Sequence, residues 1–141
     1  MKKLLLSVAF LSSSLFLFSQ CKSFTKKNCL PSLTPFASNG QINAAKLAPG
    51  EAAELQINFS KGLKYRLLLC SSDLLGEVEM KVLDKNRKEL FSDAVEENVA
   101  FWDFDAESTQ LLTIQITTPK GENQNELVGL GCVTMLAGFR E

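Results

Sequence analysis

Asp103 and Asp105 are the side chains in this sequence that are best spaced for acid–base chemistry. They stand two residues apart in a run that alternates like a β-strand, so both carboxylates should point to one face. Two carboxylates on one face can divide the acid and base roles of a hydrolase, or bind a cation. The alternative is that they are solvated residues on a strand edge and perform no chemistry.

Histidine is absent from the chain, which excludes nucleophiles activated as Ser-His or Cys-His pairs. The cysteines lack paired CxxC spacing, so the sequence does not predict a zinc site. We therefore expect a protein that is not an enzyme and that holds neither a metal nor a cofactor. A hydrolase that uses Asp103 and Asp105 on a glycan is the alternative.

Trp102, the only tryptophan, and Phe104 alternate with the two aspartates. An exposed aromatic pair beside carboxylates suits sugar binding, because ring faces bury C–H surface and carboxylates accept hydroxyl protons. These four residues are the candidate ligand-binding site. The same alternation also allows Trp102 and Phe104 to face the core, with Phe101 on the exposed side.

Four cysteines, Cys21, Cys29, Cys70 and Cys132, form an even set in a chain that looks exported, which favours disulfides. Of the three possible pairings we favour Cys21–Cys29, close in sequence, together with Cys70–Cys132. The second bridge requires its two strands to be neighbours or to face each other across the core. Buried free thiols at Cys70 and Cys132 are the alternative.

The first 19 residues are typical of a secretory signal peptide. Lys2 and Lys3 precede an apolar stretch, residues 4–18, that is short for a helix spanning a bilayer. Cleavage after Ser19 would yield a secreted or periplasmic protein without a transmembrane segment. A lipoprotein anchored through Cys21 is the less favoured alternative, because the residue just before that cysteine is not small.

The charge balance argues against nucleic acid as a partner. Two of the 15 basic residues fall in the signal peptide, which leaves 13 against 16 acidic residues. A slightly acidic chain does not attract a phosphate backbone. The predicted partner is a protein or a glycan of the cell envelope.

Beyond the signal peptide, we expect an N-terminal arm over residues 20–39 and one β-sandwich domain over residues 40–141. Pro31 and Pro35 argue against a helix in the arm, which Leu33 and Phe36 should dock onto the domain. A short helix is possible over residues 44–48. Regular alternation then predicts an all-β, antiparallel sandwich or barrel. The predicted strands cover residues 54–59, 63–70, 77–82, 90–91, 99–104, 112–116 and 127–139, with a turn at Gly62, an acidic loop over 92–98, and a bulge or close approach at Gly129 and Gly131.

Residues 55–65, with Phe59, Gly62 and Tyr65 in place, resemble the opening of a prepeptidase C-terminal (PPC)-like domain. The resemblance covers about residues 40–141, and it implies a jelly-roll-like β-sandwich of about seven or eight strands from a secreted bacterial protein. An aspartate-rich segment of that family is replaced here by residues 74–77, so no metal is implied. With its cysteine-bearing arm, the chain is similar to small stand-alone exported proteins built on this sandwich.

The predicted function is a non-catalytic, exported binding or interaction module of the bacterial envelope or medium. This prediction depends on the signal peptide, the strand pattern and the lack of a catalytic constellation. A purely structural envelope component is a further alternative.

Overall fold

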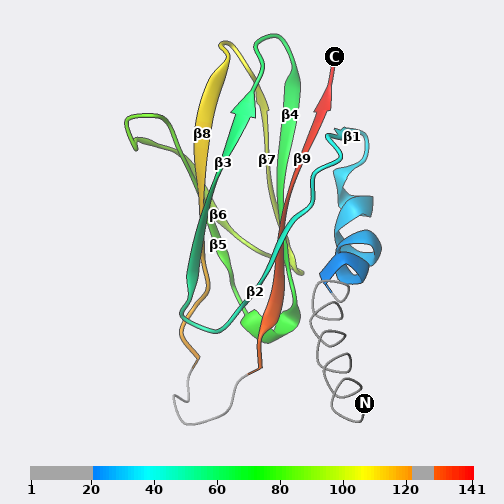
Figure 1. Cartoon of the computed structure of the whole chain (residues 1–141), viewed down its shortest axis with the longest axis vertical. Coiled ribbons are helices and arrows are strands. Elements are labelled where there is room, and N and C mark those ends of the chain that lie inside the picture. The colour runs from blue at the N-terminus through cyan, green and yellow to red at the C-terminus, as the bar shows by residue number, and fades with distance from the viewer. Residues whose placement is uncertain (1–20, 122–128) are drawn as a thin grey trace, which may run out of the picture.

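A computed structural model describes residues 21–121 and 129–141, so the predicted signal peptide lies outside the described residues. Within them the chain forms nine strands in two antiparallel sheets, which confirms the predicted all-β sandwich (Figure 1). The strands are β1 (Ala37–Ser38), β2 (Asn43–Leu47), β3 (Ala52–Phe59), β4 (Lys64–Ser71), β5 (Glu79–Leu83), β6 (Glu89–Ala94), β7 (Val99–Asp105), β8 (Gln110–Thr117) and β9 (Gly131–Arg140). Short helical elements are η1 (Thr25–Cys29), η2 (Leu30–Leu33) and η3 (Asp73–Leu75).

The two sheets interleave along the chain. The first sheet has the order β1-β9-β4-β7, with β2 also pairing with β9, and the second has the order β3-β8-β5-β6. From β2 onward every connection passes to the other sheet, except the hairpin between β5 and β6. This is the strand order of a jelly roll, in which neighbours within a sheet come from distant parts of the sequence.

Alternation along the strands separates the core from the solvent as predicted. In β3, Ile57 and Phe59 are buried while the residues between and before them are exposed or half-buried. In β4, burial becomes continuous from Leu67 to Ser71. Leu67 and Leu69 join the main core between the sheets, whereas Leu68 packs outward under the N-terminal arm. A strand that is covered on both faces has no wet side, which explains its unbroken apolar run.

The main core fills the space between the two sheets with residues from Leu47 onward, and it contains no residue of the arm. A second, smaller core lies under the arm on the outer face of the first sheet. Its buried members are Cys29, Leu33, Leu68, Cys70 and Leu136. The predicted docking of the arm through Leu33 and Phe36 is thereby confirmed.

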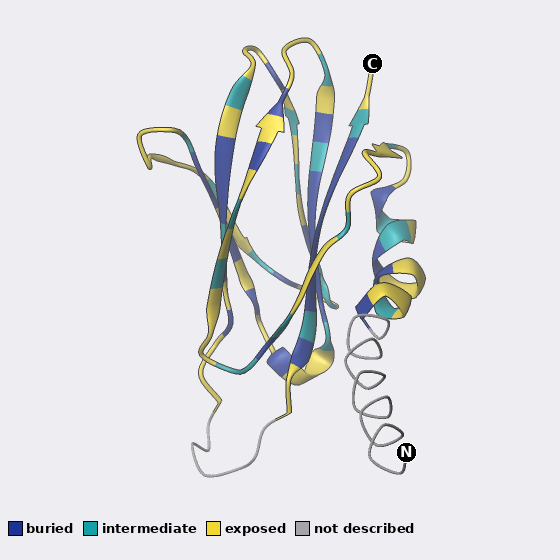
Figure 2. Cartoon of the chain, in the orientation of Figure 1, coloured by how far each residue is buried: buried dark blue, intermediate teal, exposed yellow. Residues whose placement is uncertain are grey.

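The prediction that the arm contains no helix was wrong. The chain is helical over residues 21–24 and continues through η1, a π-helix, and η2, a 3₁₀-helix. Pro31 lies in the first turn of η2, where a missing N–H is tolerated, and it cannot extend the π-helical hydrogen bonds of η1, in which the Leu30 N–H donates to the Thr25 carbonyl. The buried side of the arm faces the sheet and its outer side is exposed (Figure 2).

Two other local predictions were also wrong. Residues 43–47 form strand β2 instead of a short helix, because pairing with β9 satisfies their backbone groups and overrides their helix propensity. The predicted acidic loop over residues 92–98 is shorter, because β6 continues through Ala94. Gly62 has φ +93°, as the predicted turn requires.

All four cysteines form disulfides, but the favoured pairing was wrong. The bonds join Cys21 to Cys132, with Cα atoms 5.6 Å apart, and Cys29 to Cys70, with Cα atoms 5.7 Å apart. Cys21 and Cys29 are eight residues apart on a helical segment, a rise of about 12 Å, which exceeds the span of a disulfide. Both bridges therefore run from the arm to the sheet beneath it.

Candidate functional site

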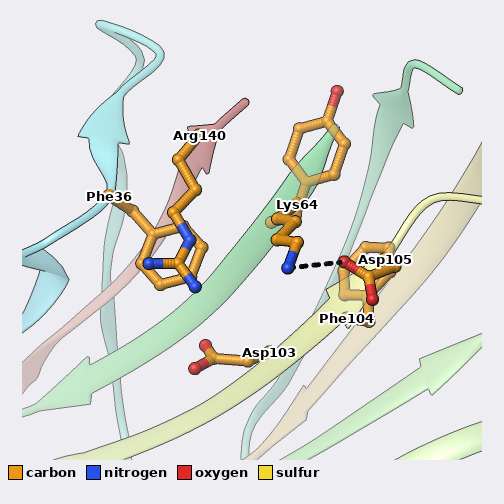
Figure 3. Close-up of a pocket in the computed structure, with 7 residues that line it drawn as sticks. Phe36, Lys64, Asp103, Phe104, Asp105 and Arg140 are labelled. Atoms are coloured by element: carbon orange, nitrogen blue, oxygen red, sulfur yellow. Dashed lines mark ion pairs between the residues drawn. The ribbon is translucent and has the colours of Figure 1, made fainter. Parts of the chain in front are cut away.

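An open pocket of about 200 Å³ lies at the end of the first sheet formed by the termini of β4, β7 and β9, beside the end of the arm, and its charged side chains lie on the outer face (Figure 3). It brings together two cations and two carboxylates from three adjacent strands and one ring from the arm. The lining residues are Phe36, Lys64, Tyr65, Asp103, Phe104, Asp105 and Arg140. We refer to it as the Arg140 pocket.

Strand register places the charged side chains of this pocket. Lys64 on β4 lies opposite Asp105 on β7 and opposite Arg140 on β9, so the three form one row across the sheet. Arg66 and Asp103 form the next row on the same face. Because side chains on a strand alternate between faces, all five point away from the main core.

Arg66 is the most completely bonded member of the group. Its Nε and Nη2 donate to the two carboxylate oxygens of Asp103 at 2.7 and 2.8 Å, a bidentate pair. Its Nη1 donates to the backbone carbonyls of Ser32 at 3.0 Å and Thr34 at 3.3 Å, both in the arm. The hydrogen bonds to Asp103 raise the pKa of Arg66 above its usual range. With its side chain only 14 % exposed, Arg66 ties the arm to the sheet.

Aromatic rings from the arm and from β7 contact the guanidinium groups. Arg66 lies 4.8 Å from the ring centre of Phe36 and 4.4 Å from that of Phe101. Arg140 lies 5.0 Å from the same Phe36 ring. Stacking of this kind orients a guanidinium while leaving its edge donors available.

Arg140 differs from Arg66 in having no ionic partner. Within residues 21–121 and 129–141, its guanidinium makes no ion pair and no hydrogen bond, and the contact with Phe36 is what holds it. Lys64 has a weak partner, because its Nζ lies 4.0 Å from Asp105 and the two side chains are 52 % and 71 % exposed. Arg140 and Lys64 thus present donors that a ligand can use.

The predicted ligand-binding residues divide between the two faces of β7. Trp102 and Phe104 point inward, against the main core. Trp102 stacks on Phe91 at 5.3 Å and on Phe104 at 4.3 Å between ring centres. Asp103 and Asp105 point outward, as does Phe101, which is 48 % exposed. Phe104, Asp103 and Asp105 still contribute to the Arg140 pocket, but Trp102 does not.

Sequence reasoning missed Lys64 and Arg140 as site residues. Each occupies a strand end far from the other in sequence, and only the register of β4 with β9 makes them neighbours. Phe36 was expected to dock the arm, and its second role as a support for Arg140 depends on that docking. The signal for the arm's helix was present, because Cys21, Thr25, Cys29 and Leu33 recur every four residues and are all buried.

Two further hollows lie elsewhere on the described part of the molecule. An apolar cleft of about 340 Å³ opens between the edge strands β2 and β3, and includes Leu47, Leu55 and Ile116 in its lining. A hollow of about 520 Å³ beside Phe101 is lined by Asp93, Glu96 and Glu97. Within the described ranges, no group of three or more side chains is arranged to hold a metal ion. Neither hollow contains a cation with free donors.

No family model matches this chain, and no curated protein matches it. The geometry of the Arg140 pocket is therefore the basis for assigning a function.

Proposed function

We propose that this protein is an exported, non-catalytic β-sandwich module that binds a component of the bacterial envelope through the Arg140 pocket. The observation that carries the proposal is Arg140 itself, whose guanidinium is oriented by Phe36 but has no acceptor among the described residues. Because Arg140 is exposed, its guanidinium donors are open to a ligand from solvent, and the Phe36 ring beside it favours one orientation of the group.

The disulfides support export. Two bonded cysteine pairs indicate an extracellular or otherwise oxidising compartment, since cytosolic thiols are kept reduced. Secretion or a periplasmic location is our proposal within that range. Among the described residues, no helix has the length and apolar character needed to cross a membrane.

A lipid anchor at Cys21 stays the less favoured alternative. The Cys21 sulfur is bonded to Cys132, and the residue is 4 % exposed. A lipoprotein would use the same sulfur for its thioether, which would leave Cys132 without a partner. The resemblance to PPC-like domains stays a prediction.

The hydrolase alternative receives less support from the site. Both carboxylate oxygens of Asp103 accept hydrogen bonds from Arg66. Arg66 also donates to two carbonyls of the arm. The ion pair of Asp103 with Arg66 is therefore part of the contact that holds the arm, and Asp103 is not a free catalytic carboxylate. Asp105 alone does not make the pair of free carboxyl groups that glycoside hydrolysis needs.

The test compares the wild-type protein with a Lys64→Gln/Arg140→Gln double variant. Each protein is immobilised with its disulfides intact and exposed to an envelope extract that contains both polysaccharide and protein. We expect the wild type to retain material that the double variant releases. Arg87→Gln is the matched control, because Arg87 pairs with Glu54 on the second sheet. Identical material on wild type and double variant would contradict the proposal.

A further inference from the structure

The size of the Arg140 pocket restricts what it can accept. At about 200 Å³ it is smaller than the roughly 300–1,000 Å³ of pockets that enclose a drug-sized ligand. It lies on an open sheet face, so a polymer can place one residue in it and continue on both sides. The pocket therefore fits one unit of a longer chain better than a free small molecule.

One side of the pocket is suited to a carboxylate. The planar guanidinium of Arg140 presents a fork of donors that matches the two oxygens of a carboxylate. Lys64 lies opposite it in the strand register, and its ammonium group has three donors of which Asp105 takes at most one. A carboxylate that lies between Arg140 and Lys64 can therefore bond to both.

The other side of the pocket is suited to hydroxyl groups. Asp105 and Arg140 lie on opposite sides of Lys64, and the Asp103 carboxylate lies in the next row of the sheet, below Lys64 and Arg140 in Figure 3. A charged carboxylate accepts about four hydrogen bonds, so Asp103 retains capacity beyond the two from Arg66. Asp105 is 71 % exposed and open to donors. These two carboxylates repel a bare anion and favour a ligand with hydroxyl donors.

From this arrangement we infer that the ligand of the Arg140 pocket is an acidic sugar, a uronate residue within a polysaccharide. Its carboxylate lies between Arg140 and Lys64, and its hydroxyl groups donate to Asp105 and Asp103. A peptide carboxyl terminus offers the carboxylate without the ring of hydroxyl donors, so it satisfies only half of the pocket. The inference rests on the proposed function and names the ligand class for the same site.

The test is calorimetric titration of the intact, disulfide-bonded protein with an oligogalacturonate and with a glucuronate-containing oligosaccharide. The same oligosaccharides after chemical reduction of their carboxyl groups serve as neutral counterparts. We expect the wild type to bind at least one acidic form and to bind its neutral counterpart at least tenfold more weakly. Arg140→Gln should weaken binding of the acidic form by a similar factor, and so should Lys64→Gln. Arg87→Gln should leave binding unchanged.

Three results would overturn the inference. Equal binding of acidic and neutral forms, both weakened by Arg140→Gln, would refute the uronate and leave the pocket's binding role intact. If a peptide with a free carboxyl terminus bound more tightly than either acidic oligosaccharide, the uronate would likewise be refuted and the binding role of the pocket would remain. Binding of neither acidic oligosaccharide would refute the ligand class, and the envelope extract would then decide the proposed function separately. Far-UV circular dichroism of each variant checks that the sandwich has folded.

Discussion

At the scale of single residues, Arg66 and Arg140 show how one side-chain type can serve two purposes on the same sheet face. Arg66 bonds to Asp103 and to carbonyls of the arm, and is largely buried. Arg140 contacts the same Phe36 ring but has no acceptor among the described residues. The first residue stabilises the fold, and the second supports our assignment of a binding site.

Arg66→Lys should lower the free energy of unfolding by about 2 kcal/mol, because lysine cannot form the bidentate pair with Asp103 and reach the arm carbonyls as well. Urea denaturation measures the loss. Arg87→Lys should have a much smaller effect, since its pair with Glu54 is exposed. Equal losses of unfolding free energy in the two variants would show that the bonds from Arg66 to Asp103 and to the arm do not stabilise the fold more than an exposed ion pair does.

Glu54 should contribute to the acid sensitivity of the protein. Hydrogen bonds from Arg87 and Gln115 lower the pKa of Glu54 below its usual value. A carboxyl group whose pKa is lower in the folded than in the unfolded chain stabilises the folded state at pH values above its unfolded pKa. This contribution is lost as the pH falls through the pKa of the folded state. In urea titrations from about pH 6 to pH 2, Glu54→Gln should therefore show a shallower loss of stability. The effect is small because the pair is exposed, and an unchanged slope would contradict it.

At the scale of elements, the docking of the arm on β9 determines whether the pocket exists. Gly138 makes this docking possible, because a Cβ at this position would lie 2.8 Å from the Leu33 Cδ1 atom and 2.8 Å from the Phe36 Cβ atom. Both distances are shorter than two non-bonded carbon atoms can approach without a shift of one of them. The Phe36 Cβ atom is attached to the backbone, so it cannot easily move away. Absence of a side chain at Gly138 brings the Phe36 ring to Arg140.

Gly138→Ala should lower the free energy of unfolding by about 1–3 kcal/mol through overpacking, and should raise hydrogen exchange in the arm. Gly129→Ala is the matched control, because its Cβ would meet Leu74 Cδ2 at an ordinary 3.6 Å. Mass spectrometry locates the change in exchange. Unchanged exchange across η1 and η2 in Gly138→Ala would mean that the arm is not held through this contact.

At the scale of the whole molecule, the protein consists of a sandwich with its own core and an arm that is bound to it by a second core and two disulfides. The main core has no residue from the arm, whereas the smaller core depends on Cys29 and Leu33. Both disulfides join the arm to the sheet, over sequence separations of 111 and 41 residues. Loss of these bonds should therefore affect the arm and the Arg140 pocket before it affects the sandwich.

A double variant with Cys29→Ala and Cys70→Ala should lose about 2–4 kcal/mol of stability, because it lacks the wild-type disulfide between these residues, which closes a long loop. It should retain cooperative unfolding and the far-UV spectrum of the sandwich. It should bind envelope material more weakly than wild type, because Phe36 is less firmly placed beside Arg140. Full binding in this variant would contradict the link between the arm and the pocket.

Peptide mapping of the unreduced wild type checks the Cys21–Cys132 and Cys29–Cys70 pairs.

Much of the fold was predictable because it depends on local patterns. Ile57 and Phe59 alternate with polar residues, and such a period of two specifies a strand with one buried face. The turn at Gly62 followed from a residue that tolerates positive φ, and the close approach at Gly131 followed from a glycine within a strand. The candidate site was only partly predictable, since Asp103 and Asp105 were identified without the cations beside them.

The sequence by itself determined the seven strands from β3 to β9, the core-facing side of regularly alternating strands such as β3, and a set of cysteines suited to an oxidising compartment, because residue type and local spacing encode these features. Only the tertiary structure decided the disulfide partners, the helical arm over β4 and β9, and the meeting of Lys64 with Arg140. Each of those depends on which strands lie side by side. In a jelly roll the neighbours within a sheet come from distant parts of the chain, so no local pattern in the sequence records them.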